Sequence, residues 1–381
     1  MIPQTVYENT LRAFMAPIGP WLDDDTVTEI MVNGPLDIYV ERKGRLSRVD
    51  SSFESCDKLL SALRLVSQFV GRPFDEMHPI LEARLPDGSR VEALLPPIAP
   101  DGPLVAIRRF SKDRLTLKKL LGFGALTPDA AETLRILIEC KQNIVVAGGT
   151  GSGKTSMLNA LSAFIPSDER VIVIEDSREL QLQREHVVHL ETRPPDARGK
   201  GSISMRELFK ASLRMRPDRI ILGEIRGGEA LDLVQAMTSG HGGCLATVHA
   251  TYPIDTLNRL ETLSLMSGVD LPLYALRSQL ASAVDIIVQT ARMRDGSRKI
   301  THISEVCGVD SQRGYQIKDV FAGRTPRHSD DGASAFKLGP TGAIPNCLEL
   351  IRSNGLALPS SIYEAAQLEL TNAKEEIHGS V

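Results

Sequence analysis

The residues with the clearest chemistry form a glycine-rich loop at 148–155, which reads Gly-Gly-Thr-Gly-Ser-Gly-Lys-Thr. Glycines permit positive φ angles and close backbone approach, so consecutive N–H groups can surround a phosphate at the positive end of the following helix. Lys154 would bring a mobile charge to the β- and γ-phosphate oxygens, and Thr155 offers a hydroxyl to a phosphate-bound Mg²⁺. We therefore predict a nucleoside triphosphate site formed by Gly148, Gly149, Thr150, Gly151, Ser152, Gly153, Lys154, Thr155 and Ser156.

The sequence around this loop has the order that a phosphate-binding loop requires. An apolar, β-rich run at 143–147 precedes it, and residues 156–164 follow with the apolar spacing of a helix. The alternative is a glycine-rich turn that binds nothing, and both the spacing and the strand-loop-helix context argue against it.

Two acidic residues end predicted strands and could complete the site. Glu224 ends the run RIILGE and could hold a Mg²⁺-bound water or polarise the attacking one; a surface ion pair with Arg226 is the alternative. Glu175 ends VIVIE, just before Asp176, and we favour it as the base or water-positioning group, with a solvated loop residue as the alternative. The residues alone leave the division of roles between these two acids open.

His249 ends the run GCLATVHA and could donate a hydrogen bond to the γ-phosphate, although a lone histidine is often only a packed or surface residue. Phosphoryl transfer also gains from a cation delivered to the developing charge. Arg108 and Arg109 close the first domain just ahead of a linker, and this location favours them over the further arginines at 193, 198, 206, 214 and 216.

Composition points to an intracellular enzyme. The 381 residues are 42% hydrophobic and 24% charged, enough for two domains. With 44 Lys and Arg against 48 Asp and Glu, the net charge of −4 gives no general attraction to nucleic acid or anionic lipid. The five cysteines include no Cys-x-x-Cys pair, which favours reduced thiols and the cytosol. No run of 18 apolar residues or signal-like N-terminus occurs, so we expect membrane contact only through partners.

Strand and helix patterns predict an α/β protein with two domains. Strands alternating with helices after the phosphate-binding loop indicate a mainly parallel sheet with helices on both faces. The predicted parts are a lead at 1–22, an α+β domain at 23–110, a linker at 111–127, the nucleotide-binding domain at 128–310, and a hairpin and helical tail at 311–381.

The four segments GGTGSGKT, VIVIEDSREL, RIILGEIRGGEALDL and GHGGCLATVHA resemble, in this order, the Walker A, Asp box, Walker B and His box of the type II/type IV secretion ATPase superfamily. The similarity covers roughly residues 20 to 308. Within the superfamily, EIMVNGPLDIYVERKGRL, RLPDGSRVEALLPP, DGPLVAIRRF and LETLSLMSGVDLPLYALRSQLASAVDIIVQ resemble most the CpaF branch, which powers tight-adherence pili.

This resemblance implies a PAS-like N-terminal domain followed by a RecA-like ATPase domain, with ATP and Mg²⁺ bound between them. It also implies a homohexameric ring, cytoplasmic and attached to the inner membrane through platform proteins, with no direct nucleic-acid contact. It assigns water activation to Glu175, Mg²⁺ handling to Glu224 and the His-box role to His249. Many members carry a long N-terminal extension, whereas this sequence begins almost at the shared module. It shows no cysteine pairs of the zinc-binding kind found in type II relatives, and it has Gly242 where an acidic or polar residue is common.

We therefore expect an ATP-hydrolysing motor for assembly, or also retraction, of a pilus. A conjugative or effector-exporting type IV secretion ATPase is the alternative. A helicase or recombinase would need a basic channel with stacking aromatics, which 4% aromatic content and a negative net charge do not favour. The intact Glu175, Lys154, Thr155 and Glu224 argue against a scaffold without turnover.

Overall fold

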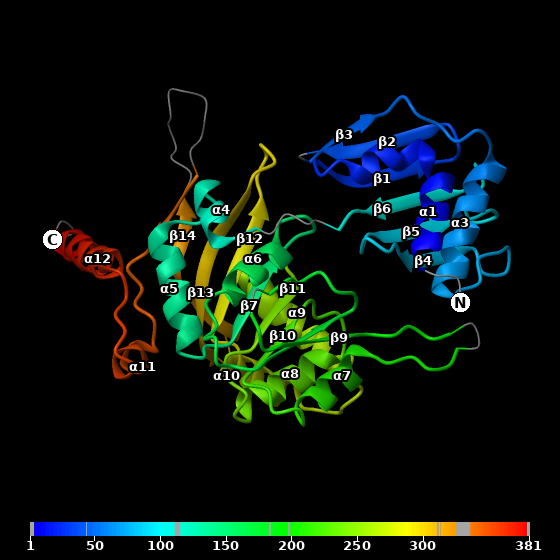
Figure 1. The fold of residues 1–381 in the computed structure, drawn as a ribbon. Coiled ribbons are helices and arrows are strands. Elements are labelled where there is room, and N and C mark those ends of the chain that lie inside the picture. The colour runs from blue at the N-terminus through cyan, green and yellow to red at the C-terminus, as the bar shows by residue number, and fades with distance from the viewer. Residues whose placement is uncertain are drawn as a thin grey trace, which may run out of the picture. The chain divides into compact units, whose positions relative to one another are not determined.

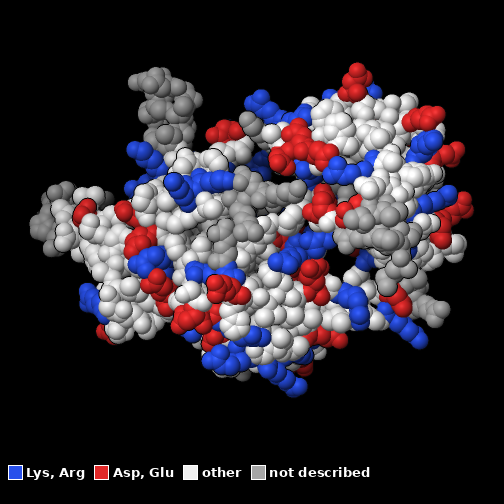
Figure 2. Space-filling view, viewed as in Figure 1, with Lys and Arg blue, Asp and Glu red and all other residues white. Residues whose placement is uncertain are grey.

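The computed structural model describes residues 4–42, 44–110, 115–182, 184–196, 199–310, 312, 314–324 and 336–378. The chain divides into two compact units, one made of Met1–Arg114 with Pro195–Gly201 and the other of Leu115–Pro194 with Ser202–Val381. Among the described residues, no helix is both long enough and apolar enough to cross a bilayer. Figure 2 shows acidic and basic side chains interspersed over the visible face, in keeping with the balanced composition.

The first unit is built on an antiparallel sheet with strand order β3-β2-β1-β6-β5-β4 (Figure 1). The strands are β1 (Val27–Asn33), β2 (Asp37–Arg42), β3 (Arg45–Arg48), β4 (Ile80–Arg84), β5 (Arg90–Leu94) and β6 (Leu104–Arg108). Buried side chains alternate with more exposed ones, as in β1, where Val27, Ile30 and Val32 enter the core. The expected α+β pattern is therefore confirmed in this unit.

Helices α1 (Gln4–Phe14) and α3 (Cys56–Val70) belong to the same unit, together with η1 (Ala16–Ile18) and α2 (Gly19–Asp23). The ring of Tyr7 stacks on that of Phe69 with centroids 3.8 Å apart, which joins α1 to α3. Helix α3 begins at Ser55, whose side chain accepts the N–H of Lys58, and ends at Gly71, whose φ of 67° favours glycine.

The second unit contains a larger sheet with strand order β15-β14-β13-β12-β7-β11-β10-β8-β9. Its strands are β7 (Ile144–Gly148), β8 (Val171–Glu175), β9 (Val187–Glu191), β10 (Arg219–Leu222), β11 (Leu245–His249), β12 (Ile286–Arg292), β13 (Arg298–Asp310), β14 (Gly314–Arg324) and β15 (Lys337–Pro340). The run from β12 to β9 is parallel, whereas β13 to β15 are antiparallel. The predicted α/β fold with a mainly parallel sheet is confirmed.

Helices cover both faces of this sheet (Figure 1). One apolar core includes residues of α4 (Leu117–Gly122), α5 (Pro128–Glu139), α6 (Lys154–Ser162), α11 (Leu348–Ser353) and α12 (Ser360–His378). The other includes residues of α7 (Met205–Ser212), α8 (Glu229–Thr238), α9 (Pro253–Leu265) and α10 (Leu273–Ala283). Strands β7, β8 and β10 are buried along their whole length because both of their faces are covered.

Several elements differ from the sequence-based expectation. Helix α4 lies inside the expected linker at 111–127, where Thr116 caps it and Leu120 is buried. Helix α9 lies in a stretch for which no element is predicted from the sequence, whereas β14 and β15 lie in the part for which a hairpin and helical tail are predicted. Residues 111–114 of the expected linker and residues 325–335 of the expected C-terminal tail lie outside the described residues.

At the amino ends of the central strands, Asn143 connects three neighbouring strands. Its side chain donates to the carbonyl of Ala283 at 2.8 Å and accepts the N–H of Cys244 at 3.1 Å, while its own N–H donates to Oδ2 of Asp285 at 2.7 Å. Burial raises the pKa of Asp285 to about 6, and the Glu305 carboxylate adds to the rise. Asp285 therefore carries a charge at neutral pH that the fold disfavours.

We predict that Asp285→Asn removes a pH-dependent part of the stability. Folding raises the pKa of the Asp285 carboxyl, so the ionised group lowers the free energy of unfolding above pH 6. This destabilisation disappears as the pH falls from about 6 toward 4. The variant should gain on the order of 2 kcal/mol over the wild type at pH 8, and this advantage should fall to about half at pH 5 and mostly disappear by about pH 4. Urea unfolding of both chains from pH 5 to 8 measures this, and a difference that stays constant with pH would contradict it.

Candidate functional site

The phosphate-binding loop connects β7 to α6, in the order that the sequence predicts. Gly151 and Gly153 take positive φ angles of 69° and 97°, which open the backbone around the start of the helix. The Ser152 hydroxyl lies 2.8 Å from the carbonyl oxygen of Gly149 and 2.8 Å from the hydroxyl of Thr290, which itself donates to the carbonyl of Ala147 at 3.0 Å. The loop is thus held against β12 and leads into the positive end of a helix.

Lys154 begins α6 and turns back over the loop. Its side chain is largely buried, and Nζ donates to the carbonyls of Gly148 and Gly149 at 3.1 and 3.0 Å. The same Nζ lies 3.4 Å from Nδ1 and 3.5 Å from Nε2 of His249. Thr155 and Ser156 follow in the first turn of α6, and both are half-buried.

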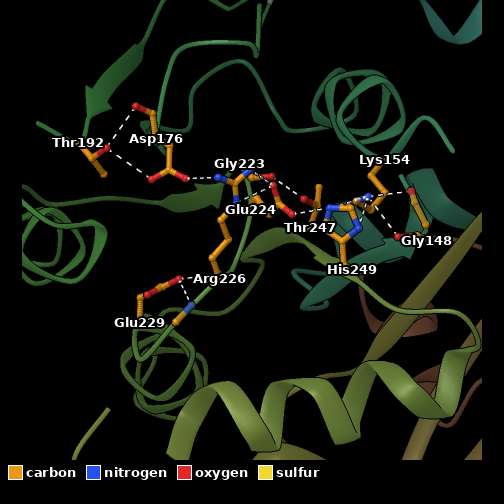
Figure 3. Close-up of polar contacts among 12 residues, drawn as sticks. Gly148, Lys154, Asp176, Thr192, Gly223, Glu224, Arg226, Glu229, Thr247 and His249 are labelled. Atoms are coloured by element: carbon orange, nitrogen blue, oxygen red, sulfur yellow. Dashed lines mark hydrogen bonds and ion pairs between the residues drawn. The ribbon is translucent and has the colours of Figure 1, made fainter. Parts of the chain in front are cut away.

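Strand pairing brings His249 to this loop. In the parallel register of β11 with β7, His249 lies opposite Gly148. Its Nε2 is 2.8 Å from Oε1 of Glu224, so Lys154, His249 and Glu224 form a continuous line of polar contacts (Figure 3). The structure therefore brings together three of the predicted site residues.

The electrostatic surroundings of His249 favour its neutral form. Burial lowers the pKa of the imidazole and the Lys154 charge lowers it further, while the Glu224 carboxylate opposes both. The tautomer that suits both neighbours carries its proton on Nε2, donates to Glu224 and presents the Nδ1 lone pair to the lysine.

Glu224 is also paired on its other side. Its Oε2 accepts from Nε of Arg226 at 2.9 Å and from Nη2 of the same guanidinium at 2.5 Å. Nη1 of Arg226 lies 3.0 Å from Oδ2 of Asp176, which follows β8. The ion pair that the sequence offered as an alternative role for Glu224 is thus present, and it coexists with the contact to His249 (Figure 3).

Glu175 lies on the neighbouring strand and is 3% exposed. Its Oε1 accepts the N–H groups of Glu179 and Leu180, each at 2.9 Å, and its Oε2 is 3.8 Å from Nδ1 of His189. A Cβ built on Gly223 would come within 2.8 Å of its Cγ, so Glu175 touches the strand end that carries Glu224. One of its oxygens holds the following loop, and the line from Lys154 to Glu224 does not include it.

The two arginines predicted at the end of the first domain differ in their surroundings. Arg109 has a side chain only 9% exposed that donates to the carbonyls of Asp24 and Val27 and pairs with Asp25 at 3.5 Å. Arg108 ends β6 and is exposed. Arg109 therefore stabilises its own unit, whereas the Arg108 side chain is exposed at the surface.

Sequence reasoning did not select three residues that shape the loop and its surroundings. Thr290 lies opposite Gly148 in the register of β12 with β7. Arg298 donates from Nε to the carbonyl of Gly151 at 3.0 Å. Asp176 forms an ion pair with Arg226. The pairing of distant strands creates the first two contacts, and no local motif marks them. Of the further arginines, Arg206 pairs with Asp232 at 2.5 Å, and residue 198 lies outside the described part of the chain.

Comparison with known proteins identifies the family. Residues 13–324 match the type II/IV secretion system protein family, to which the chain belongs. A putative conjugal transfer protein of Mycobacterium tuberculosis is 33% identical over 325 residues, covering 84% of this chain and 91% of the relative. The type IV secretion system protein PtlH of Bordetella pertussis is 36% identical over 300 residues, covering 72% and 88%.

Among solved structures, the ATPase DotB of Yersinia pseudotuberculosis has the same fold, with a TM-score of 0.53 and 17% identity over 80% of this chain and 79% of that one. The superfamily resemblance seen in the sequence is therefore confirmed. With its complete phosphate-binding loop, the chain is a P-loop ATPase that binds ATP.

We predict that Gly148→Ala damages the loop, whereas Gly149→Ala does not. A Cβ on Gly148 would lie 2.3 Å from Oγ1 of Thr290 and 2.4 Å from Oγ of Ser152, whereas a Cβ on Gly149 meets no described atom within 4 Å. The first variant should lose about 1 to 3 kcal/mol of stability and most ATP affinity. Thermal unfolding and fluorescent-nucleotide titration measure both effects, and equal behaviour of the two variants would refute this account of the loop.

Proposed function

We propose that this chain is the ATP-hydrolysing motor of a type IV secretion or conjugation machine. The line of contacts from Lys154 through His249 to Glu224 carries the chemical part of the proposal. The names of relatives at 33% and 36% identity, matched over most of their own length, support the export or conjugation role. Family membership alone supports the broader class, a secretion-system ATPase.

In the proposed reaction, water attacks the γ-phosphorus, the bond to the leaving ADP oxygen breaks, and the water proton passes to a carboxylate. Lys154 would exchange its contacts with loop carbonyls for phosphate oxygens, which places its charge where negative charge develops. We assign the carboxylate role to Glu224, whose Oε1 would exchange its contact with His249 for the attacking water, because His249 in turn contacts Lys154 of the loop. In Glu175, by contrast, Oε1 already accepts the N–H groups of Glu179 and Leu180. It would have to break these hydrogen bonds before it could take a proton from water.

A Mg²⁺ ion fits the oxygen donors of this site. The Thr155 hydroxyl in the first turn of α6 would hold it, and Glu224 would do so through water, because Arg226 and His249 already occupy both of its oxygens. When bound, the ion would neutralise charge on the phosphate oxygens. The role of the protein is to keep these donors fixed around the loop.

We further propose that the chain acts as a homo-oligomer, a hexameric ring at the cytoplasmic face of the inner membrane that moves platform proteins of its machine. The superfamily resemblance supports this arrangement. Arg108, exposed at the end of β6, is then a better candidate than Arg109 for a cation that reaches a neighbouring subunit, because Arg109 is engaged within its own unit.

Assembly of a tight-adherence pilus is the second candidate function. The segments RGGEALDL and LETLSLMSGVDLPL favour it, because they resemble the CpaF branch. The two candidates share the ATPase chemistry and differ in the membrane partner that the motor moves.

Affinity capture distinguishes them. The Glu224→Gln chain, held with ATP, should retain integral proteins of a secretion or conjugation channel from native membranes, identified by mass spectrometry. Lys154→Ala, which removes the cation of the loop, is the control and should retain none of them. Recovery of a small pilus-type platform protein would move the assignment to the pilus, and recovery of no membrane partner would contradict both.

A further inference from the structure

Arg226 connects the two acidic strand ends of the site. Both Nε and Nη2 contact the same oxygen of Glu224, Oε2, at 2.9 and 2.5 Å. This arrangement leaves Oε1 for Nε2 of His249 at 2.8 Å. A carboxylate whose one oxygen is held by a rigid, planar guanidinium cannot rotate freely about its terminal bond.

The arginine is itself held at two points, its side chain and its backbone. Nη1 lies 3.0 Å from Oδ2 of Asp176, and Asp176 in turn accepts the hydroxyl of Thr192 at its backbone carbonyl, 3.2 Å away. The backbone N–H groups of Arg226 and Gly227 both donate to Oε1 of Glu229, at 2.7 and 2.8 Å. Backbone and side chain are thus fixed by different elements, the start of α8 and the loop after β8.

Close packing also fixes the path of the loop after Glu224. A Cβ built on Gly228 would lie 2.6 Å from Cα of Ser267, so the chain can pass there only as glycine. The loop therefore has little freedom to move the guanidinium away from Glu224 while the neighbouring segment stays in place.

We propose that Arg226, anchored by Asp176, is a positioning residue that holds Glu224 with its Oε1 directed at His249, next to the phosphate-binding loop. This inference rests on the proposed role of Glu224 in ATP turnover. The Arg226 side chain is 57% exposed, so its ion pairs contribute little to folding, and their main effect is on orientation.

The test compares steady-state ATP hydrolysis by the full chain and its variants. Arg226→Ala should lower kcat about 10- to 100-fold while KM for ATP changes less than about threefold, since a supporting contact of a reacting group is lost. Arg226→Lys should recover part of the loss. Asp176→Asn should lower kcat less, and the double variant should be no slower than Arg226→Ala alone, because both changes act through one contact.

Arg135→Ala is the matched control. Arg135 also bridges two carboxylates, those of Glu132 and Glu139, but all three residues lie on α5. This variant should keep kcat within about twofold of the wild type.

The proposal is overturned if Arg226→Ala retains wild-type kcat, if its loss appears only in KM, or if Arg135→Ala loses as much. Glu224→Gln distinguishes failure of the positioning role from failure of the proposed role of Glu224. Full turnover by Glu224→Gln would remove the proposed role of Glu224 itself. Loss of turnover by that variant, with Arg226→Ala unaffected, would remove only the positioning role.

Discussion

The parallel hydrogen bonding of β7 with its two neighbours is the constraint on which the site depends. It places His249 of β11 and Thr290 of β12 on either side of Gly148, where the phosphate-binding loop begins. The carboxyl ends of β8 and β10 lie at the same edge, so Glu175 and the residues after Leu222 reach the same region. Side chains 138 positions apart, those of Ser152 and Thr290, become neighbours because register is fixed wherever both faces of a sheet are buried.

Charges of opposite sign then alternate outward from the loop. The ammonium of Lys154 is separated by a neutral imidazole from the carboxylate of Glu224, which pairs with Arg226, which pairs with Asp176. A neutral His249 is important in this series because an imidazolium would repel the lysine and bind the carboxylate more tightly. Its lowered pKa, caused first by burial and then by Lys154, keeps the ring neutral at ordinary pH.

Much of this organisation follows from local sequence. The spacing of the glycines and the apolar runs on either side predict a strand, a loop and a helix. The structure confirms this order, and Gly151 and Gly153 take positive φ angles in the loop. The α+β pattern of the first unit and the parallel sheet of the second were also readable from apolar periodicity.

The remainder depends on contacts between segments that are distant in sequence. No spacing rule reveals that Thr290 touches Ser152, that Arg226 joins Glu224 to Asp176, or that Glu175 uses one oxygen to hold the loop that follows it. For β14 the sequence indicates a hairpin without the bounds of the strand, because its pairing with β13 at the antiparallel edge outweighs a weak local pattern.

If His249 and Glu224 act as one unit at the phosphate-binding loop, a double-mutant cycle on kcat will show it. His249→Ala, Glu224→Gln and the double variant would be compared with the wild type under saturating ATP. We expect the double variant to be at most about threefold slower than the slower single variant, because the effects of residues that act as one unit are not additive. Losses that multiply across the two positions would show that the histidine and the carboxylate act independently and would contradict the account.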